Sequence, residues 1–434
     1  MFFLHPKIVN DNRRMIMEWS IDTAKNLDRD DVLSSYRSRF HYPKNSEGRE
    51  KLYFTGNSLG LCPKTAREYI YKELDQWESL GSKGHVQASI PWIEYHHSVK
   101  ASLARLLGAK KSEVIAMNSL TTNLHLMMTS FYRPNVDRHK IIILKDAFPS
   151  DRYAVASQIQ NHGFDPKTSL VEIASNPDQP TISEQKIRQT IAQHGSSTSL
   201  ILMEGVSYLS GQFFDIEEIS KVAKEYGCMF GVDLAHAVGN VPLQLHDWNI
   251  DFAVWCNYKY LNGGPGTVGG CFVHQKYETQ FDLPRLSGWW GHDEKRRFLM
   301  EKDFSPMKGI DGWCLSNAPI LLVAALRASL AIFDEVDLGQ LREKSVRLTR
   351  FLEEGLIGHC KKSIKILTPN DSNRRGAQLS LCFPDEGKEM FDSLQQHDVV
   401  CDWREPNVIR VAPTPLYTRY EDVFRFVEIL NKIS

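Results

Sequence analysis

Six short apolar runs between residues 114 and 273 constrain the fold of this chain more than any other feature. Longer stretches with helical periodicity separate them, and the runs cover residues 114–117, 141–144, 200–203, 229–232, 252–256 and 271–273. Continuously apolar runs of this length are typical of strands that helices bury on both faces of a parallel sheet. The pattern therefore predicts an α/β domain built on a mostly parallel sheet.

The clearest of the intervening helices is expected over residues 215–226. Asp215 is placed to cap its amino end, Glu218 would complete a capping box, and Gly227 would end the helix. Its apolar side chains share one face, and they are Ile216, Ile219, Val222, Ala223 and Tyr226.

The pattern of expected helices and strands changes near residue 320. Helices are expected at 324–335, 341–354 and 421–432, and short strands at 378–383, 399–404 and 408–411. These elements predict a smaller α+β domain. We therefore divide the chain into an N-terminal segment (1–60) that packs with the small domain, a large α/β domain (61–320) and the small domain (321–434).

Composition excludes several classes of partner. The 434 residues carry a formal net charge of −1, so the chain lacks the excess of positive charge that is typical of nucleic-acid-binding proteins. No apolar run has the length of a membrane helix, and the apolar start is too short for a secretory signal. The eight cysteines form no C-x-x-C pair and no zinc-ligand spacing. We expect a cytoplasmic protein without a metal, for which Met15 or Met17 is an alternative start.

A lysine and an aspartate at the ends of two neighbouring runs carry the strongest chemical signal. Lys259 follows the run 252–256 and precedes a glycine-rich turn, and Asp233 follows the run 229–232. Enzymes that use pyridoxal phosphate (PLP) need both groups. The lysine forms a Schiff base with the cofactor aldehyde, and the carboxylate keeps the pyridine nitrogen protonated. Either residue alone is more typical of a solvated loop or a helix cap.

Candidate partners for the phosphate and the ring of this cofactor follow other runs. Thr121 lies near the start of a helix, where free N–H groups and its hydroxyl suit a phosphate, although a plain helix cap is the alternative. Phe148 could stack on the pyridine ring, and Asp151 could support its polar edge. Tyr258 is a further donor, and His236 either reaches the cofactor or lies in the core.

Arg410 lies inside an apolar run of the small domain. A buried guanidinium needs a partner, which is either the carboxylate of a substrate or an internal acid. Two other motifs carry no such signal. The stretch Gly264-Pro-Gly-Thr-Val-Gly269 precedes a strand rather than a helix, so it does not predict a dinucleotide site. The pair His96-His97 has no acidic or cysteine neighbour at ligand spacing and is expected on the surface.

Together these segments resemble the kynureninase family, whose members are fold-type I PLP enzymes of the class V aminotransferase superfamily. Asp-x-x-His before the lysine is general to the superfamily, whereas the strings at 233–240, 288–292 and 410–413 are specific to the family. The resemblance covers most of the chain and also includes residues 54–61, 118–121, 148–151, 246–248 and 258–261.

The resemblance implies a large domain with a seven-stranded, mostly parallel sheet and a homodimer with shared active sites. Lys259, Tyr258 and Asp233 would be catalytic, and Arg410, His85 and Asn317 would contact the substrate. The implied cofactor contacts are Leu120, Thr121, Phe148, Pro149, Ser150, Asp151, Asp233, His236, Tyr258, Lys259, Trp289 and Asn317. One position departs from the family: Glu204 stands where some relatives carry a small polar residue, so no cofactor role is carried onto it.

The reaction implied by the resemblance is hydrolysis of L-kynurenine or 3-hydroxy-L-kynurenine to an anthranilate and L-alanine, in tryptophan catabolism or NAD synthesis. An aminotransferase, a cysteine desulfurase and a noncatalytic PLP-binding protein are the alternatives. A desulfurase would need a reactive cysteine on a mobile loop near the small domain. Cys360 and Cys382 lie in that half, but without a basic or glycine-rich loop signature.

Overall fold

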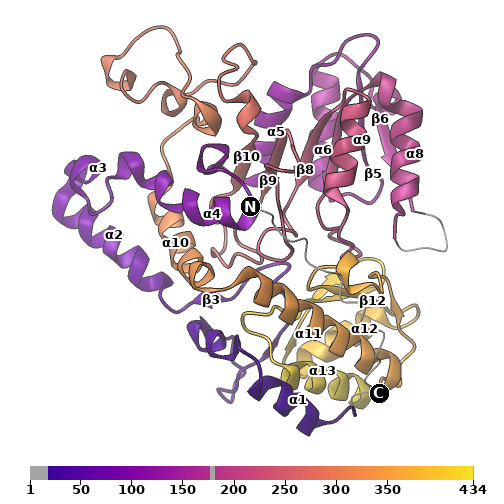
Figure 1. Ribbon diagram of the computed structural model, residues 1–434. Coiled ribbons are helices and arrows are strands. Elements are labelled where there is room, and N and C mark those ends of the chain that lie inside the picture. The colour runs from indigo at the N-terminus through magenta and orange to yellow at the C-terminus, as the bar shows by residue number, and fades with distance from the viewer. Residues whose placement is uncertain (1–17, 176–180, 434) are drawn as a thin grey trace, which may run out of the picture.

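A seven-stranded sheet forms the centre of the chain (Figure 1). The computed structural model describes residues 18–175 and 181–433. Six strands run in one direction, and β10 is antiparallel to both of its neighbours. In sheet order the strands are β4 (Val114–Ala116), β10 (Gly270–Val273), β9 (Phe252–Trp255), β8 (Met229–Asp233), β7 (Thr198–Glu204), β5 (Lys140–Leu144) and β6 (Leu170–Ile173).

Alternate residues of these strands enter two separate apolar cores. In β5, Ile142 and Leu144 belong to one core, and Ile141 and Ile143 belong to the other. The first core includes α4 (Lys100–Leu107), α8 (Glu184–His194), α9 (Ile216–Glu225) and α10 (Ile320–Glu335), and the second includes α5 (Leu120–Phe131) and α6 (Pro149–Asn161). Because helices cover both faces, the strands need no polar alternation. The expected α/β fold is confirmed.

Local signals explain why α9 was predictable and β6 was not. The Asp215 carboxylate accepts a hydrogen bond from the backbone N–H of Glu218 at 3.0 Å, and Gly227 follows the helix at φ 65°. Strand β6 lies at the edge of the sheet with most of its residues at least partly exposed, including Glu172, so it has no continuous apolar run. An edge strand leaves that weaker pattern because only part of it is covered.

The C-terminal part folds as a four-stranded antiparallel sheet covered by helices. Its strands, in sheet order, are β11 (Lys365–Ile366), β12 (Leu379–Cys382), β15 (Val408–Val411) and β14 (Asp402–Arg404). The single strand expected at 399–404 is wrong. Its first two residues form β13 (Val399–Val400), which pairs with β2 (Leu52–Tyr53) in a separate sheet, and only β14 pairs with β15. The helices are α11 (Leu338–Gly358), α12 (Gly387–Gln396) and α13 (Tyr420–Lys432).

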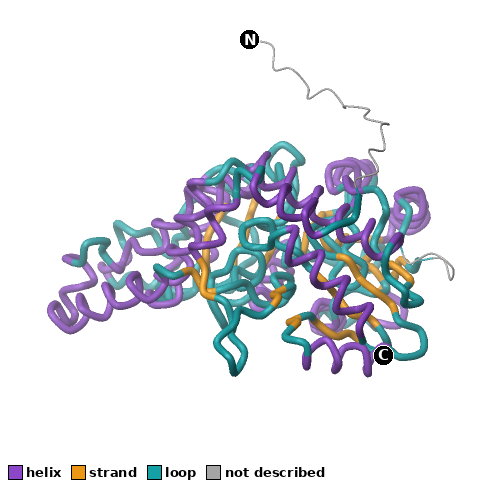
Figure 2. The backbone as a smooth tube through the Cα atoms, turned by 90° about the horizontal axis from the view of Figure 1, so that it is seen from below, coloured by secondary structure: helices purple, strands orange, loops and turns teal. Residues whose placement is uncertain are grey.

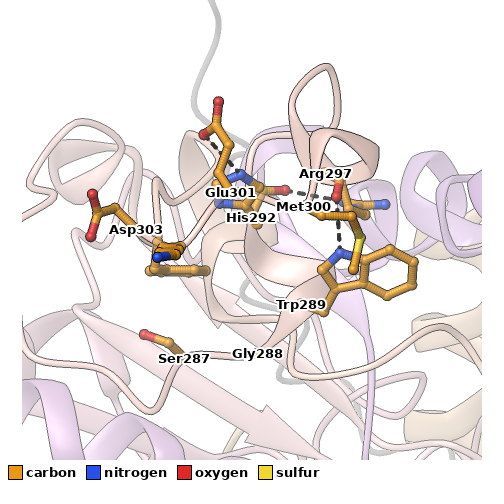
Figure 3. Close-up of a pocket in the computed structure, with 10 residues that line it drawn as sticks. Ser287, Gly288, Trp289, His292, Arg297, Met300, Glu301 and Asp303 are labelled. Carbon is orange, nitrogen blue, oxygen red and sulfur yellow. Dashed lines mark hydrogen bonds and ion pairs between the residues drawn. The ribbon is translucent and has the colours of Figure 1, made fainter.

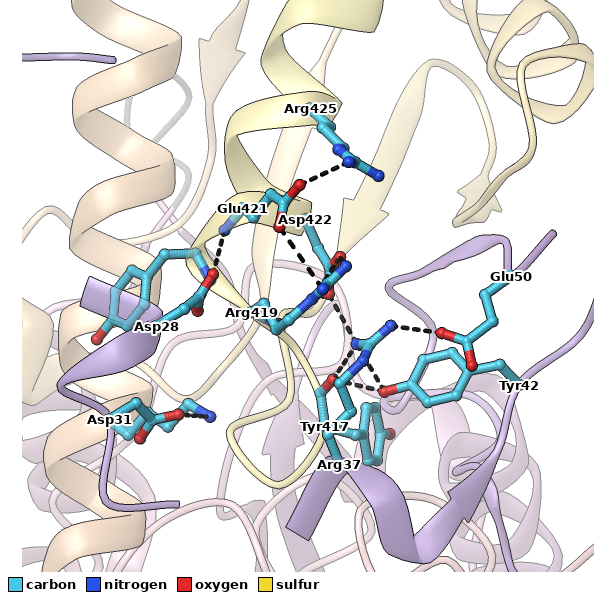
Figure 4. Close-up of polar contacts among 12 residues, drawn as sticks. Asp28, Asp31, Arg37, Tyr42, Glu50, Tyr417, Arg419, Glu421, Asp422 and Arg425 are labelled. Atoms are coloured by element: carbon cyan, nitrogen blue, oxygen red, sulfur yellow. Dashed lines mark hydrogen bonds and ion pairs between the residues drawn. The ribbon is translucent and has the colours of Figure 1, made fainter. Parts of the chain in front are cut away.

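The N-terminal segment is tied to the last helix by charged groups (Figure 4). In the last turn of α1 (Ile21–Arg29), Asp28 accepts hydrogen bonds from the first backbone N–H groups of α13, at Tyr420 (2.7 Å) and Glu421 (3.0 Å). An acid at this end of a helix is favourable because the helix dipole is positive there. Arg37 pairs with Asp422 at 2.8 Å. The domain boundaries at residues 60 and 320 stay a prediction, and Met15 and Met17 lie outside the described residues.

The remaining elements pack around these two sheets. Helix α2 (Ala66–Leu80) lies along α10, and both α2 and α3 (Gly84–Gln87) project from the side of the large sheet (Figure 1). Seen from below, helices and loops surround the strands (Figure 2). Among the described residues, no helix is both long and apolar enough to cross a membrane. The short elements are β1 (Phe40–His41), β3 (Cys62–Pro63) and α7 (Pro166–Ser169).

Candidate active site

The expected lysine and its neighbours meet at the carboxyl edge of the large sheet. Asp233 is the last residue of β8, and Lys259 lies in the loop that follows β9. The Lys259 Nζ is 2.9 Å from His236 Nε2 and 5.9 Å from the centre of the Phe148 ring. In open sheets with parallel strands, this edge is where ligands bind.

Lys259 and His236 form a buried pair of nitrogen groups. Burial lowers the pKa of the Lys259 amine below its usual range. Burial, and then the positive charge of Lys259, hold the pKa of His236 well below its ordinary value, so the imidazole is neutral. The lysine can therefore donate to Nε2 of a neutral ring. The other ring nitrogen, Nδ1, is buried and has no hydrogen-bond partner in the structure.

Asp233 and Asp151 bring two acids to the same place. The Asp233 carboxylate accepts a hydrogen bond from the backbone N–H of Ala235 at 2.6 Å. Burial, and then the neighbouring Asp233, raise the pKa of Asp151 well above its usual range, so Asp151 is the member of the pair that carries a proton. Its Oδ1 is buried without a partner. The pair can therefore accept or hold a proton at the polar edge of a ring.

The start of α5 offers a cradle for an anion. Ser119 precedes this 12-residue helix but makes no capping hydrogen bond with its side chain, so the first N–H groups stay free. The Thr121 hydroxyl lies 2.7 Å from the hydroxyl of Ser150 at the start of α6. A Cβ on Gly269 would come within 3.0 Å of the Leu120 nitrogen. A glycine there keeps this helix end open to a phosphate.

These groups fit PLP in their chemistry. A buried amine, a pair of acids that share a proton, an aromatic ring and an uncapped helix start surround one place. Buried polar atoms without partners cluster around it, on Asp151, Glu204, His236 and Arg410. A ligand with several polar groups explains such a concentration, because buried polar atoms are seldom left unpaired.

Arg410 has an internal acid as its partner. In the β14–β15 ladder it stands opposite Asp402, and its Nε donates to the Asp402 carboxylate at 2.7 Å. Its Nη1 donates to the backbone carbonyl of Tyr208 at 2.8 Å. Its Nη2 lies 2.7 Å from the same carboxylate oxygen but makes no well-aligned hydrogen bond. The internal ion pair is therefore present, and the Nη2 nitrogen of the guanidinium can still donate a hydrogen bond to a ligand.

Three expected site residues are exposed or half exposed in the single chain. His85 and Asn317 are exposed, and the His85 ring stands edge-on to Trp92. Trp289 is half exposed, and its indole N–H donates to the carbonyl of Arg297 at 3.1 Å. It lines a separate cavity of about 260 Å³ between residues 287 and 304 (Figure 3). These residues are on the surface of the single chain.

Residues 54–60 connect the small sheet to the lysine loop. At one end, the N–H of Ala412 donates to the carbonyl of Phe54 at 2.8 Å. At the other, the N–H of Gly60 donates to the carbonyl of Tyr258 at 2.8 Å. A Cβ on Gly60 would lie 2.9 Å from Asn262 Cα and closer still to the Lys259 carbonyl oxygen. We call residues 54–60 the connecting segment.

Sequence reasoning missed Tyr208 and Asp402. The Tyr208 ring packs edge-on against Phe148 at 5.3 Å, and its carbonyl holds Arg410. No motif marks it. Asp402 could have been found, because residues 405–407 form a turn between β14 and β15, and a hairpin with that turn places residues 402 and 410 opposite each other.

The expectation for the histidine pair at 96 and 97 is wrong for His96. The turn that contains it buries Trp92, Tyr95 and Val99, and this face also carries His96, which is 4% exposed. Asp311 lies 3.8 Å from it, although its carboxylate is paired with Lys100 at 2.6 Å. A cation would have to displace that ammonium.

A second group of possible ligands, Glu113 with His246 and His274, is internally bonded. Glu113 accepts hydrogen bonds from the backbone N–H groups of Lys110 (2.7 Å) and Gln275 (2.8 Å), and it also pairs with His246. We interpret it as structural.

Comparison with known proteins gives two family matches. The model of the Kynureninase C-terminal domain matches residues 341–430, and that of the Cys/Met metabolism PLP-dependent enzymes matches residues 95–292. The kynureninase of Koribacter versatilis is 49% identical over 94% of this chain and 97% of its own length. The kynureninase of Myxococcus xanthus is 48% identical over 96% of this chain and 98% of its own.

Solved structures share the fold at much lower identity. A cysteine desulfurase from Thermococcus onnurineus superposes with a TM-score of 0.74 at 18% identity, over 88% of this chain and 94% of its own. The desulfurase CsdA from Escherichia coli gives 0.75 at 16% identity, over 92% and 98%. At such identities the likeness shows the fold alone.

Proposed function

The chain belongs to the kynureninase family, and on this premise we propose that its Lys259 pocket hydrolyses L-kynurenine or its 3-hydroxy form to an anthranilate and L-alanine. It is a PLP-dependent enzyme. The observation that carries the proposal is the buried Lys259 amine at 2.9 Å from a neutral His236, on the same sheet edge as Asp233.

Each side chain of the pocket has a task that follows from its surroundings. Lys259 would hold the cofactor aldehyde and, when free, take the proton from the substrate α-carbon, because its lowered pKa makes the neutral amine accessible. Asp233 would keep the pyridine nitrogen protonated. The bound cofactor supplies an electron-accepting ring beside that α-carbon. Burial raises the pKa of Tyr258, so its hydroxyl stays protonated and can donate a proton.

Different groups of the pocket would bind the phosphate and the substrate. The free N–H groups of α5 and the hydroxyls of Thr121 and Ser150 suit the phosphate. Arg410 suits the substrate carboxylate, because the guanidinium nitrogen without an aligned partner can take one carboxylate oxygen while Asp402 holds the other side.

A second copy of the chain would complete the site. Trp289, Asn317 and His85 are exposed or half exposed in the single chain. Leu286, Phe298, Leu299 and Met300 next to Trp289 are also exposed. An exposed apolar surface of this kind is typical of a protein interface. We therefore propose a homodimer in which this surface reaches the partner's pocket.

The desulfurase alternative is disfavoured by the two cysteines of the small domain. Burial raises the pKa of both thiols, whereas a nucleophilic cysteine needs a lowered pKa. Cys382 is also fixed in the strand β12.

Product analysis tests the function directly. The protein is incubated with PLP and either L-kynurenine or 3-hydroxy-L-kynurenine, and the anthranilate and alanine are quantified by chromatography. Equimolar products are expected from the wild type and none from Lys259→Ala. Lys221→Ala, on the exposed face of α9, serves as the matched control and should be fully active. A keto acid without anthranilate would select the aminotransferase, and turnover in Lys259→Ala would refute the proposed site.

A further inference from the structure

Glu204 is a buried acid beside Lys259 to which the reaction above assigns no part. It is the last residue of β7 and stands directly opposite Asp233 in the ladder between β7 and β8. Its side chain is almost fully buried, with 4% of the residue exposed. The two acids therefore leave the sheet side by side at the edge where the pocket forms.

The two oxygens of Glu204 have different surroundings. Oε1 accepts a hydrogen bond from the backbone N–H of Phe148 at 3.2 Å, so Glu204 fixes the residue whose ring flanks Lys259. Oε2 is buried and has no partner. A carboxylate with one bare, buried oxygen is costly, whereas a carboxylic acid can place its proton there and act as a donor.

The charges around Glu204 also favour the protonated acid. The groups that face it come from four elements: Asp233 on β8, Asp151 and the Phe148 N–H at the start of α6, Lys259 after β9, and the N–H and phenol of Tyr208 after β7. The two N–H groups and Lys259 lower the pKa of Glu204, but burial and Asp233 outweigh them. Lys259 is the one cation of this set, against two other carboxyl groups, Asp233 and Asp151. Burial, and then Asp233, raise the pKa of Glu204 to about 8. Below that pH the side chain is neutral, and above it the pocket gains a negative charge.

We propose that Glu204 is a positioning residue of the cofactor pocket that acts as a neutral carboxylic acid, so that loss of its proton weakens the binding of PLP. With PLP bound, the pocket would hold a phosphate and Lys259 would no longer present a free ammonium, so a further buried negative charge would be less favourable. The inference shares with the proposed function the assignment of PLP to this pocket. It does not depend on which substrate is hydrolysed.

Equilibrium dialysis of the full-length holoenzyme against PLP, from pH 7 to pH 9.5, tests the proposal without any substrate. Glu204→Gln keeps the shape, cannot ionise, and retains a donor. At pH 7 it should bind PLP like the wild type. Above pH 8 the wild type should lose affinity more steeply, by an additional factor that approaches about tenfold per pH unit. Glu172→Gln, which removes an acid from the exposed edge of the sheet, should follow the wild type.

The comparison between variants isolates Glu204 from the titration of Lys259, which all of them share. Identical pH profiles for the wild type and Glu204→Gln would overturn the proposal, and so would a large loss of affinity in Glu204→Gln at pH 7. If the glutamine variant does not fold, Glu204→Ser, which also cannot ionise in this range, should show the same shallower profile. Failure to produce anthranilate would leave these results unaffected.

Discussion

Replacing Gly60 by alanine should damage catalysis without touching a reacting group. Gly60 lies at the end of the connecting segment, and its N–H holds the carbonyl of Tyr258, the neighbour of Lys259. An added Cβ would lie 2.9 Å from the Cα of Asn262 and nearer still to the Lys259 carbonyl oxygen and the Asn262 side chain. Asn262 is itself buried, with 1% of the residue exposed, so it cannot swing aside.

The size of the effect follows from that crowding. Cβ atoms are essentially never found within 3.0 Å of such neighbours, and two of the three obstacles are backbone atoms. The lysine loop must therefore move by roughly 0.5–1 Å, and a misplacement of about 1 Å can cost on the order of 100-fold in rate. The overpacking itself should destabilise the fold by about 1–3 kcal/mol. We expect kcat to fall by about 10- to 100-fold.

Steady-state kinetics at saturating PLP measure this prediction, with circular dichroism to show that the variant is folded. Gly358→Ala is the matched control, because a Cβ at this exposed end of α11 meets nothing within 4 Å. It should keep wild-type kcat. A Gly60→Ala enzyme with unchanged kcat would show that the contact with the lysine loop does not fix its position.

Two further changes test other contacts. Arg410→Lys removes the planar fork that pairs with Asp402, and we expect KM for kynurenine to rise about tenfold or more with a smaller change in kcat; an unchanged KM would refute the carboxylate role. Arg37→Ala removes one of the two arginines that pair with the buried Asp422, together with the hydrogen bonds of Arg37 to Tyr42 and Tyr417, and the free energy of unfolding in urea should fall by about 1.5–3 kcal/mol. Arg29→Ala, whose pair with Asp30 is exposed, should lose less than about 0.5 kcal/mol, and equal losses in the two variants would contradict this reasoning.

The large sheet was predictable because both of its faces are covered. Burial on two sides removes polar residues from the strands, and this leaves apolar runs that a sequence shows directly. The same argument fails at the edge, where β6 keeps Glu172 exposed, and in the small domain, where the chain changes sheets between Val400 and Asp402. Those features depend on which distant segment supplies the neighbouring strand.

The candidate site likewise contains residues that the sequence predicts and contacts that only the structure shows. Lys259, Asp233 and Phe148 follow directly from strand ends, so their meeting at one edge could be expected. The partner of Arg410 required the register of a hairpin, and the contact between Glu204 and Phe148 required the side-chain positions. The expectation that His96 is exposed was wrong because a short turn can bury a polar residue on the same face as its apolar neighbours. Trp289, Asn317 and His85 lie on the surface of the single chain, and their roles depend on the proposed second copy.

The connecting segment has a consequence for how the protein is made. The carbonyl of Phe54 accepts a hydrogen bond from Ala412, and the carboxylate of Asp28 accepts one from Tyr420. These contacts near the start of the chain can therefore form only after residues 412–420 have been made. The large sheet uses residues 114–273 and can pair its strands while the C-terminus is still in the ribosome. The connecting segment, which reaches Tyr258, can be anchored at its other end only after Ala412 has left the ribosome. A newly made chain should therefore complete its sheet first and order its lysine loop last.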